Sequence, residues 1–298
     1  MNTEFGKVFN IMRTQKNIKL KEITCEELSI YTLSRFENGK TVLAADKFYT
    51  ALRRIFVRPE EFDVFYRHYS LSEDNFFSFD YSEAYAKRDI TSLQHYLSIA
   101  NQFYANETES YFWRINCLML RGMIFSLHND PNDRNVEPLQ DKDITFLKNY
   151  LDDAKIFSAY EIWLIMASAS FLDYDFTLRY AQKIMQISNT FAKDRDVRRN
   201  AIQAILNTLS LATGRAHSAE DAIKLISFLD TFQIPAQDVL QRGCLKFSKG
   251  AYLTMIGQIE KGVEQMEAVV HALKEMDAHE FYQVLKADLD TRKALLNH

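Results

Sequence analysis

The tripeptide Gly39-Lys40-Thr41 has the ending of a phosphate-binding loop, a segment whose chemistry is nucleotide binding. Such a loop needs a second glycine five residues before the Gly-Lys pair, so that bare backbone N–H groups can surround the phosphates. Ser34 occupies that position, inside a stretch that has the apolar spacing of a helix. The sequence therefore excludes a phosphate loop here, and the three residues need another explanation.

No other spacing of residues predicts catalysis or metal binding. Cys25, Cys117 and Cys244 lie far apart, without the CxxC or Cys/His spacing of a zinc site and without the density of a disulfide framework. The seven histidines, among them His271 and His279, show no ligand spacing, and no nucleophile or metalloprotease motif occurs. We therefore expect a protein that is not an enzyme and that uses no metal and no cofactor.

Composition and charge narrow the class of protein. The 298 residues are 47% apolar, and only eight glycines and four prolines interrupt them, which favours long helices. No stretch has the apolar length of a signal peptide or a membrane span, so we expect a cytoplasmic protein that does not enter a membrane. Residues 1–66 carry a net charge of +2 and the remainder −6, which suits a small DNA-reading unit attached to a larger body.

The first 66 residues divide into short helices, which must position any side chain that reads DNA. Apolar residues at helical spacing predict helices over residues 4–15, 19–25, 30–38, 44–56 and from 59 onwards. Ser29 stands where an N-cap belongs, and Gly39 supplies a left-handed stop. Between them, Leu33 and Phe36 form the pair that we expect to be buried. Two short helices joined by a tight turn and braced by flanking helices form a helix-turn-helix.

Residues 4–56 resemble the phage-repressor type of helix-turn-helix. The string Ser29-x-x-x-Leu33-Ser34-Arg35-Phe36-Glu37-x-Gly39 resembles the version found in the Rgg/GadR/MutR family of bacterial transcriptional regulators. Gly39-Lys40-Thr41 is then the loop that follows the recognition helix. Members of this family usually carry a small or amide-bearing residue at the position of Tyr31, and Ile30 is apolar. The operator sequence therefore does not carry over from the family.

Each polar side chain around the recognition helix has an expected role. Arg13 and Glu37 are expected to form a structural ion pair that ties the first helix to the third. Ile30, Tyr31 and Arg35 lie on the face opposite the buried pair, where they can contact bases. The alternative for Arg35 is a solvated surface position. Contacts with DNA phosphates are expected from three residues at the ends of elements: Lys19, Asn38 and Lys40.

From about residue 72 the chain becomes a series of helices with regular breaks. The breaks lie near Asn129, Leu172, Gly214 and Gly257, at intervals of 43, 42 and 43 residues. A two-helix repeat of that length indicates an α-solenoid, in which each pair buries its apolar face on the next. The last unit resembles a tetratricopeptide repeat, with small residues such as Gly250 where helices must approach closely. About five pairs fit between residues 72 and 276, followed by a terminal helix over 278–296.

Two polar stripes predict a peptide-binding site on the first helices of successive pairs. Amide side chains, which can bond to the backbone of an extended peptide, recur at i, i+3 and i+7 in Asn200, Gln203 and Asn207. Cations, which can hold a carboxylate, recur at i, i+4 and i+7 in Arg242, Lys246 and Lys249. Arg114 and Arg121, seven residues apart, can add to the cationic stripe. The alternative is that each stripe is an ordinary solvated face.

We therefore expect an all-α protein with a helix-turn-helix DNA-binding domain over residues 1–66. Residues 67–298 are expected to form a domain of tetratricopeptide-like helix pairs that binds a peptide and dimerises. The resemblance implies a homodimeric quorum-sensing regulator, with a double-stranded DNA operator and a short signalling peptide as its partners. A dimer fits because one recognition helix reads too few base pairs for useful affinity. Two alternatives stay open: a scaffold that binds and inhibits a partner protein, and a regulator that senses a metabolite.

Overall fold

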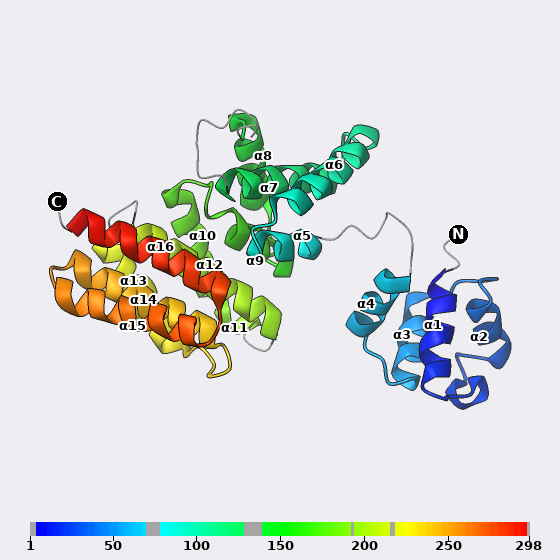
Figure 1. The fold of residues 1–298 in the computed structure, drawn as a ribbon. Coiled ribbons are helices and arrows are strands. Elements are labelled where there is room, and N and C mark those ends of the chain that lie inside the picture. The colour runs from blue at the N-terminus through cyan, green and yellow to red at the C-terminus, as the bar shows by residue number, and fades with distance from the viewer. Residues whose placement is uncertain (1–3, 70–77, 128–138, 192–193, 215–217, 297–298) are drawn as a thin grey trace. The chain divides into compact units, whose positions relative to one another are not determined.

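The computed structural model describes residues 4–69, 78–127, 139–191, 194–214 and 218–296. Contacts divide the chain into two compact units, Met1–Phe77 and Ser78–His298. In the described residues every regular element is a helix (Figure 1), apart from an isolated bridge between Cys25 and Leu28. The all-α class expected from the sequence is confirmed.

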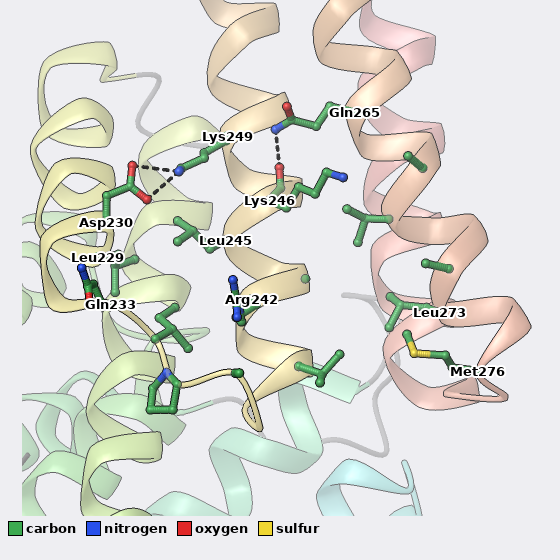
Figure 2. A pocket seen from close by; sticks show the side chains of 18 residues that line it. Leu229, Asp230, Gln233, Arg242, Leu245, Lys246, Lys249, Gln265, Leu273 and Met276 are labelled. Atoms are coloured by element: carbon green, nitrogen blue, oxygen red, sulfur yellow. Dashed lines mark hydrogen bonds and ion pairs between the residues drawn. The ribbon is translucent and has the colours of Figure 1, made fainter. Parts of the chain in front are cut away.

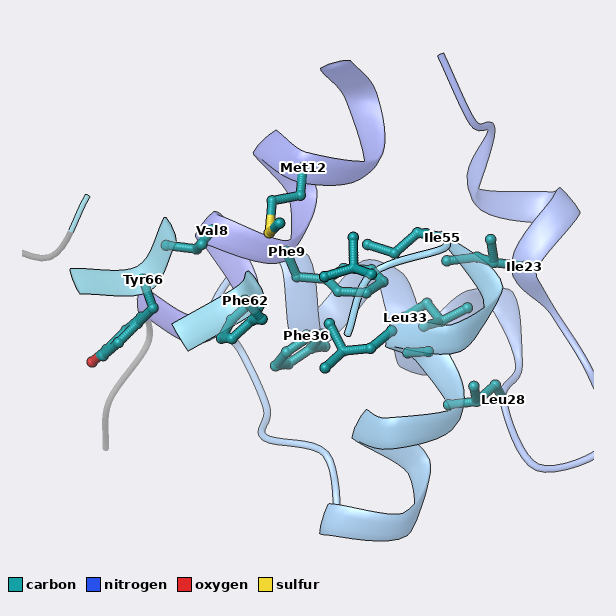
Figure 3. Close-up of a cluster of buried hydrophobic side chains, with 13 residues drawn as sticks. Val8, Phe9, Met12, Ile23, Leu28, Leu33, Phe36, Ile55, Phe62 and Tyr66 are labelled. Atoms are coloured by element: carbon teal, nitrogen blue, oxygen red, sulfur yellow. The ribbon is translucent and has the colours of Figure 1, made fainter. Parts of the chain in front are cut away.

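The first unit is a bundle of short helices around an apolar core. Its elements are α1 (Glu4–Gln15), the 3₁₀ helix η1 (Leu20–Ile23), α2 (Ile30–Glu37), α3 (Ala45–Arg54) and α4 (Pro59–Tyr69). The core is built from side chains of every element (Figure 3), among them Phe9, Ile23, Leu33, Phe36, Ile55 and Phe62. The helix α4 ends at Tyr69, three residues beyond the domain boundary expected at residue 66.

The caps of α2 are formed by the residues that the sequence indicated. The Ser29 hydroxyl accepts a hydrogen bond of 3.1 Å from the backbone N–H of Thr32, which satisfies one of the unpaired donors at the start of the helix. At the other end Gly39 has φ of +67°, a left-handed conformation that glycine adopts without steric cost. These two residues fix the length and the exit direction of α2.

The second element differs from the expected helix over residues 19–25. Only Leu20–Ile23 are helical, and they form a single 3₁₀ turn. The backbones of Cys25 and Leu28 then exchange two hydrogen bonds of 3.1 Å each, so the chain must reverse after Thr24. This reversal lets both Ile23 and Leu28 enter the core, where each is fully buried. Burial of two apolar side chains therefore outweighs the continuation of the helix.

The second unit is a succession of helices that pack in pairs and stack along the chain (Figure 1). The helices are α5 (Ser78–Ala86), α6 (Ile90–Asn106), α7 (Tyr111–Leu127), α8 (Asp141–Asp153), α9 (Ala159–Ser168), α10 (Tyr174–Gln186), α11 (Ser188–Phe191), α12 (Arg195–Thr213), α13 (Ala219–Phe232), α14 (Val239–Met255), α15 (Ile259–Glu275) and α16 (His279–Leu296). The helix α12 packs on α9 and α14, and α15 packs on α14 and α16. The helical repeat expected from the sequence is confirmed.

The expected breaks fall between helices. The helix α12 ends at Thr213 with Gly214 as its C-cap, and Gly257, two residues after α14, has φ of +85°. Leu172 directly precedes Asp173, which is the N-cap of α10. The Asp173 carboxylate accepts a hydrogen bond of 2.8 Å from the N–H of Phe176. The break placed near Asn129 lies outside the described residues.

Two glycines let α14 and α15 cross with their backbones in contact. A Cβ added to Gly250 would lie 2.7 Å from the carbonyl oxygen of Gly262, and one added to Gly262 would lie 2.5 Å from the carbonyl oxygen of Gly250. Both distances are shorter than a carbon–oxygen contact allows. The close approach expected at Gly250 is therefore present, and it fixes how α15 lies beside α14.

Candidate functional site

The exposed face of α2 carries the side chains expected to contact bases. Leu33 and Phe36 point into the core and are 0% and 3% exposed, whereas Ile30 and Tyr31 are 52% and 68% exposed. Singly exposed apolar side chains are ordinary on a protein surface, so what marks this face is that both lie on one helix beside the cation Arg35. The exposed Ile30 methyl groups and Tyr31 ring are therefore available to a thymine methyl group.

The third side chain of this face, Arg35, lies beside the Tyr31 ring and the Lys40 carbonyl. Its Nη1 lies 3.4 Å from the Tyr31 hydroxyl, to which it donates, and its Nη2 donates to the Lys40 carbonyl at 3.3 Å. The guanidinium also lies 5.6 Å from the centre of the Tyr31 ring. These contacts are long, and they use two of the five guanidinium donors. Arg35 thus lies on the exposed side of α2 and keeps donors for a guanine.

The three residues expected to contact phosphates differ in what they do. Lys19 and Lys40 are exposed at the start of η1 and just after α2, on loops where a cation can reach DNA backbone. Asn38 instead donates its side-chain N–H to the Ser34 carbonyl at 2.7 Å and so caps the end of α2. The two lysines remain phosphate candidates, and the Asn38 amide has a structural task as well.

Arg13 and Glu37 join α1 to the end of α2 in a buried ion pair. Arg13 Nε donates to Glu37 Oε1 at 2.6 Å and its Nη2 donates to Oε2 at 2.8 Å, a bidentate arrangement. The two side chains are 10% and 7% exposed. Arg13 also donates to the Ile18 carbonyl at 2.5 Å, so one guanidinium holds together α1, the segment between α1 and η1, and the end of α2. The ion pair therefore fixes the position of α2, but its two side chains are buried and are not part of the exposed surface of that helix.

Gly6, which no sequence pattern singled out, lets α1 lie directly against α2. A Cβ at this position would come within 1.8 Å of the Phe36 carbonyl oxygen. Glycine inside a helix costs roughly 1 kcal/mol relative to alanine. That cost is a signal in the sequence, because a glycine inside an apolar-periodic helix usually has a packing reason.

Two cavities of the second unit contain residues expected to bind the peptide. The cationic stripe of Arg242, Lys246 and Lys249 borders the larger one. This cavity, of about 940 Å³, lies along α14 between α13 and α15, and Figure 2 shows Arg242, Lys246 and Lys249 following one another on α14. Lys249 is paired with Asp230 of α13, whose carboxylate oxygens lie 2.6 and 2.8 Å from its Nζ. Arg242 and Lys246 are exposed toward the cavity.

The amide stripe on α12 does not line this cavity. Gln203 donates to the Asn207 amide oxygen at 2.9 Å, and Asn207 donates to the Met166 carbonyl at 2.9 Å. Met166 lies in the last turn of α9, where carbonyls lack a partner within the helix, so Asn207 caps α9. Asn200 is half-buried on the same helix and is also absent from the cavity wall. The single pocket expected from the two stripes is therefore not formed.

Arg114 and Arg121 border a second cavity, of about 400 Å³, formed by α6, α7 and the start of α8. The guanidinium of Arg114 lies 3.7 Å above the ring of Phe146, and Arg121 lies 3.9 Å from the carboxylate of Asp143. In the same wall, burial raises the pKa of the Cys117 thiol to about 11. None of the residues of α14 lines this cavity, so these arginines do not extend the cationic stripe.

Comparison with known proteins places the chain in a family. Residues 94–287 match the family model described as "HTH-type transcriptional regulator Rgg, C-terminal domain", which covers more than half of the chain. The chain belongs to the Rgg family. The resemblance read from the recognition helix is thereby confirmed, and since this family consists of transcriptional regulators, so is the expectation that the chain is not an enzyme.

Solved structures share the fold of this Rgg-family chain over nearly its whole length. A protein from Listeria monocytogenes EGD-e is 19% identical with a TM-score of 0.78, covering 99% of this chain and 98% of its own. The SHP pheromone receptor Rgg2 of Streptococcus dysgalactiae is 19% identical with a TM-score of 0.72, covering 96% and 98%. ComR of S. thermophilus, solved with DNA and its signalling peptide ComS, is 12% identical with a TM-score of 0.54, covering 96% and 99%.

Two features are absent from the described part of this Rgg-family chain. Its described histidine, cysteine and carboxylate side chains form no group of three that could hold a metal ion. Its described helices include none with both the length and the apolar character needed to cross a membrane.

Proposed function

We propose that this Rgg-family chain is a homodimeric transcriptional regulator that reads a double-stranded DNA operator with α2 and senses a short signalling peptide with its repeat domain. The DNA-binding domain, expected over residues 1–66, is the first unit, whose last helix α4 runs to Tyr69, and the second unit binds the peptide and dimerises. The observation that carries the proposal is the exposed face of α2, where Ile30, Tyr31 and Arg35 lie opposite the buried side chains of the same helix.

The chemistry of this face suits the major groove. A guanidinium can bond in a bidentate manner to the O6 and N7 atoms of guanine, and apolar side chains contact the methyl group of thymine. Lys19 and Lys40 lie at the ends of neighbouring elements, where cations contact phosphates and set the register of the helix. The ion pair of Arg13 with Glu37 holds the helix at a fixed angle to α1. We infer that the structural residues position the helix and the exposed residues read sequence.

Two of the proteins that share this fold support the sensing function. Rgg2 is described as a receptor for the SHP pheromone, and ComR was solved with both DNA and its signalling peptide. A regulator that acts on DNA and responds to an imported peptide would work in the cytoplasm. A short open reading frame beside the gene, encoding a peptide with an apolar tail, would supply the signal.

The test is binding of the purified full-length chain to overlapping fragments of the DNA upstream of its own gene, followed by fluorescence anisotropy. We expect one fragment to be bound by a dimer, with log K falling linearly as log salt rises, by about 0.9 per phosphate contact. Lys40→Ala should lower that salt slope by about 1 per half-site while it weakens binding to every sequence alike.

A different outcome would favour one of the alternatives. If no upstream fragment is bound at low salt, or if removal of residues 1–66 leaves the regulatory effect in cells unchanged, the chain acts as a scaffold for a partner protein. If DNA binding is present but responds to a small metabolite and to no peptide, the sensing part of the proposal is wrong.

A further inference from the structure

The cavity bordered by Arg114 and Arg121 carries more positive than negative charge on its wall. Lys142 at the start of α8 adds a third cation, and among the described residues of the wall Asp143 is the one carboxylate. Three cations against one carboxylate leave a net charge of +2. Arg121 Nη1 lies 3.9 Å from Asp143 Oδ2, which is longer than a hydrogen bond, so the carboxylate neutralises this cation only in part.

Arg114 contacts a ring where a carboxylate would be expected. Its guanidinium lies 3.7 Å above the centre of the Phe146 ring, and the described part of the chain provides no hydrogen bond or ion pair to this side chain. The contact with the ring leaves the guanidinium N–H donors for other partners. Lys142 is exposed and lies four residues before Phe146, so both are on the same face of α8. Arg114 and Lys142 therefore line adjoining parts of the cavity.

The start of α8 adds the donors of a helix end to these cations. Gln140 is the N-cap of this 13-residue helix, and its side chain makes no capping hydrogen bond. Gln140, Lys142 and Asp143, all from this end of the helix, line the cavity. The first backbone N–H groups of a helix lack partners within it, and the macrodipole is positive there. An anion in the cavity would thus meet a helix end and cations from two helices.

The rest of the wall suits hydroxyl groups better than hydrocarbon. Tyr104 provides a phenol hydroxyl and Gln140 an amide, and no described residue bonds to either side chain. Cys117 and Leu118 are the apolar members of the described wall. A volume of about 400 Å³, at roughly 30 Å³ for each water-sized atom, has room for about 13 non-hydrogen atoms. A bare phosphate ion would leave most of that space empty.

We propose that this cavity binds a small phosphorylated polyol of about the size of a pentose phosphate. The phosphate lies between Arg114 and Lys142 at the start of α8, and the polyol hydroxyls bond to Tyr104, Gln140 and Asp143. A phosphate monoester carries a charge of about −1.5 to −2 at pH 7 and three acceptor oxygens, which matches the excess charge of the wall, whereas one carboxylate would match half of it. This ligand is additional to the peptide proposed above, and its binding does not depend on peptide sensing.

The test uses the full-length chain, with ¹⁵N-labelled arginine side chains, in a buffer without phosphate. The probes are ribose 5-phosphate, inorganic phosphate, ribose and succinate. The Arg114 Nε resonance, assigned by its loss in Arg114→Gln, reports the cavity directly, and ³¹P relaxation of ribose 5-phosphate gives Kd for each variant. We expect a saturable shift with ribose 5-phosphate and none with ribose. Inorganic phosphate should bind at least about tenfold more weakly, because it lacks the hydroxyl contacts.

Substitutions in the wall separate the effects of its charges. Arg114→Gln and Lys142→Gln should each weaken ribose 5-phosphate about tenfold, by loss of a charge-assisted contact. Asp143→Asn should tighten binding by about threefold, because it removes the negative charge of the wall. Arg179→Gln, 60% exposed on α10 and outside this cavity, should leave binding unchanged. Melting curves that coincide with wild type show that the variants are folded, and the exposed Lys142 is the substitution least able to disturb the fold.

Any one of several results would overturn the assignment. The Arg114 resonance would stay unshifted up to about 10 mM ribose 5-phosphate, where a millimolar Kd would be visible, or would shift equally with ribose. Inorganic phosphate or succinate would bind as tightly as ribose 5-phosphate. Lys142→Gln would bind as wild type does, or Asp143→Asn would bind more weakly. None of these measurements uses DNA or a peptide, so their failure would leave the proposed function standing.

Discussion

Replacing Glu37 with leucine should destabilise the first unit by stranding a buried cation. In the structure Glu37 provides two of the four acceptors around the Arg13 guanidinium, at 2.6 and 2.8 Å, and the Ile18 carbonyl and Asn10 amide provide the others. Leucine fills a similar volume, so the variant isolates the loss of charge from the creation of a cavity. Breaking a buried ion pair by removing one partner costs about 3–5 kcal/mol.

That cost is large relative to the stability of a small domain, which is about 5–15 kcal/mol. Hydrogen exchange of the full-length chain, followed by mass spectrometry of peptides from α1 and α2, measures it locally. Protection of these peptides should fall by roughly 10² to 10⁴, since each factor of ten corresponds to about 1.4 kcal/mol. Peptides from the second unit should keep wild-type protection.

Two control variants make the reasoning refutable. Arg58→Ala removes an ion pair with Glu61 in which the side chains are 76% and 48% exposed, and such surface pairs contribute about 0–1 kcal/mol. Arg13→Met combined with Glu37→Leu removes both buried charges, and its stability should recover most of the loss because no unpaired charge remains. Protection in Glu37→Leu within fivefold of wild type would refute the account, as would a double variant no more stable than the single one.

Two further predictions concern other buried groups. Asp238→Ala should destabilise the second unit by about 3 kcal/mol, the low end of the range for a broken buried pair, because the Asp238 carboxylate is 0% exposed while its partner Arg199, which donates to it at 2.7 Å, is 33% exposed. Urea unfolding followed by tryptophan fluorescence measures the loss, and an unchanged midpoint would contradict it. At pH 8 a thiol reagent should modify Cys25 first, because burial raises the pKa of both Cys117 and Cys244 to about 11 and keeps them protonated. Peptide mapping after brief labelling checks the order, and labelling of Cys117 or Cys244 before Cys25 would contradict the prediction.

The parts of the fold that could be predicted from the sequence depend on local interactions. An N-cap serine bonds three residues along the chain, and a glycine stop acts on its own backbone, so Ser29 and Gly39 could be read without tertiary structure. The repeat spacing likewise follows from helix ends. The reversal at Cys25 and Leu28 was missed because its cause is burial of Ile23 and Leu28 in a core shared with other helices.

The candidate peptide site shows where spacing stops being informative. Spacing of i, i+3 and i+7 shows which residues share a face of a helix but not which neighbouring helix covers that face. Asn207 bonds to Met166, a residue 41 positions earlier in the chain, and Lys249 bonds to Asp230, 19 positions earlier. The spacing of residues within a stripe gives no information about either partner, Met166 or Asp230. The sequence therefore locates the stripes. Only the structure shows which of their residues bond to a neighbouring helix and which remain available to a ligand.

The central claim, that α2 reads DNA, is tested most directly by Arg35→Ala. The measurement is fluorescence anisotropy with the bound upstream fragment at fixed salt, with Arg54→Ala on the exposed surface of α3 as the matched loss of charge. One bidentate contact with a base is worth about 1–3 kcal/mol, so Arg35→Ala should weaken binding roughly ten- to a hundredfold per half-site and lose preference for the operator over unrelated DNA. Arg54→Ala should keep that preference. Operator binding by Arg35→Ala equal to that of wild type, in a protein with an unchanged melting curve, would contradict the claim.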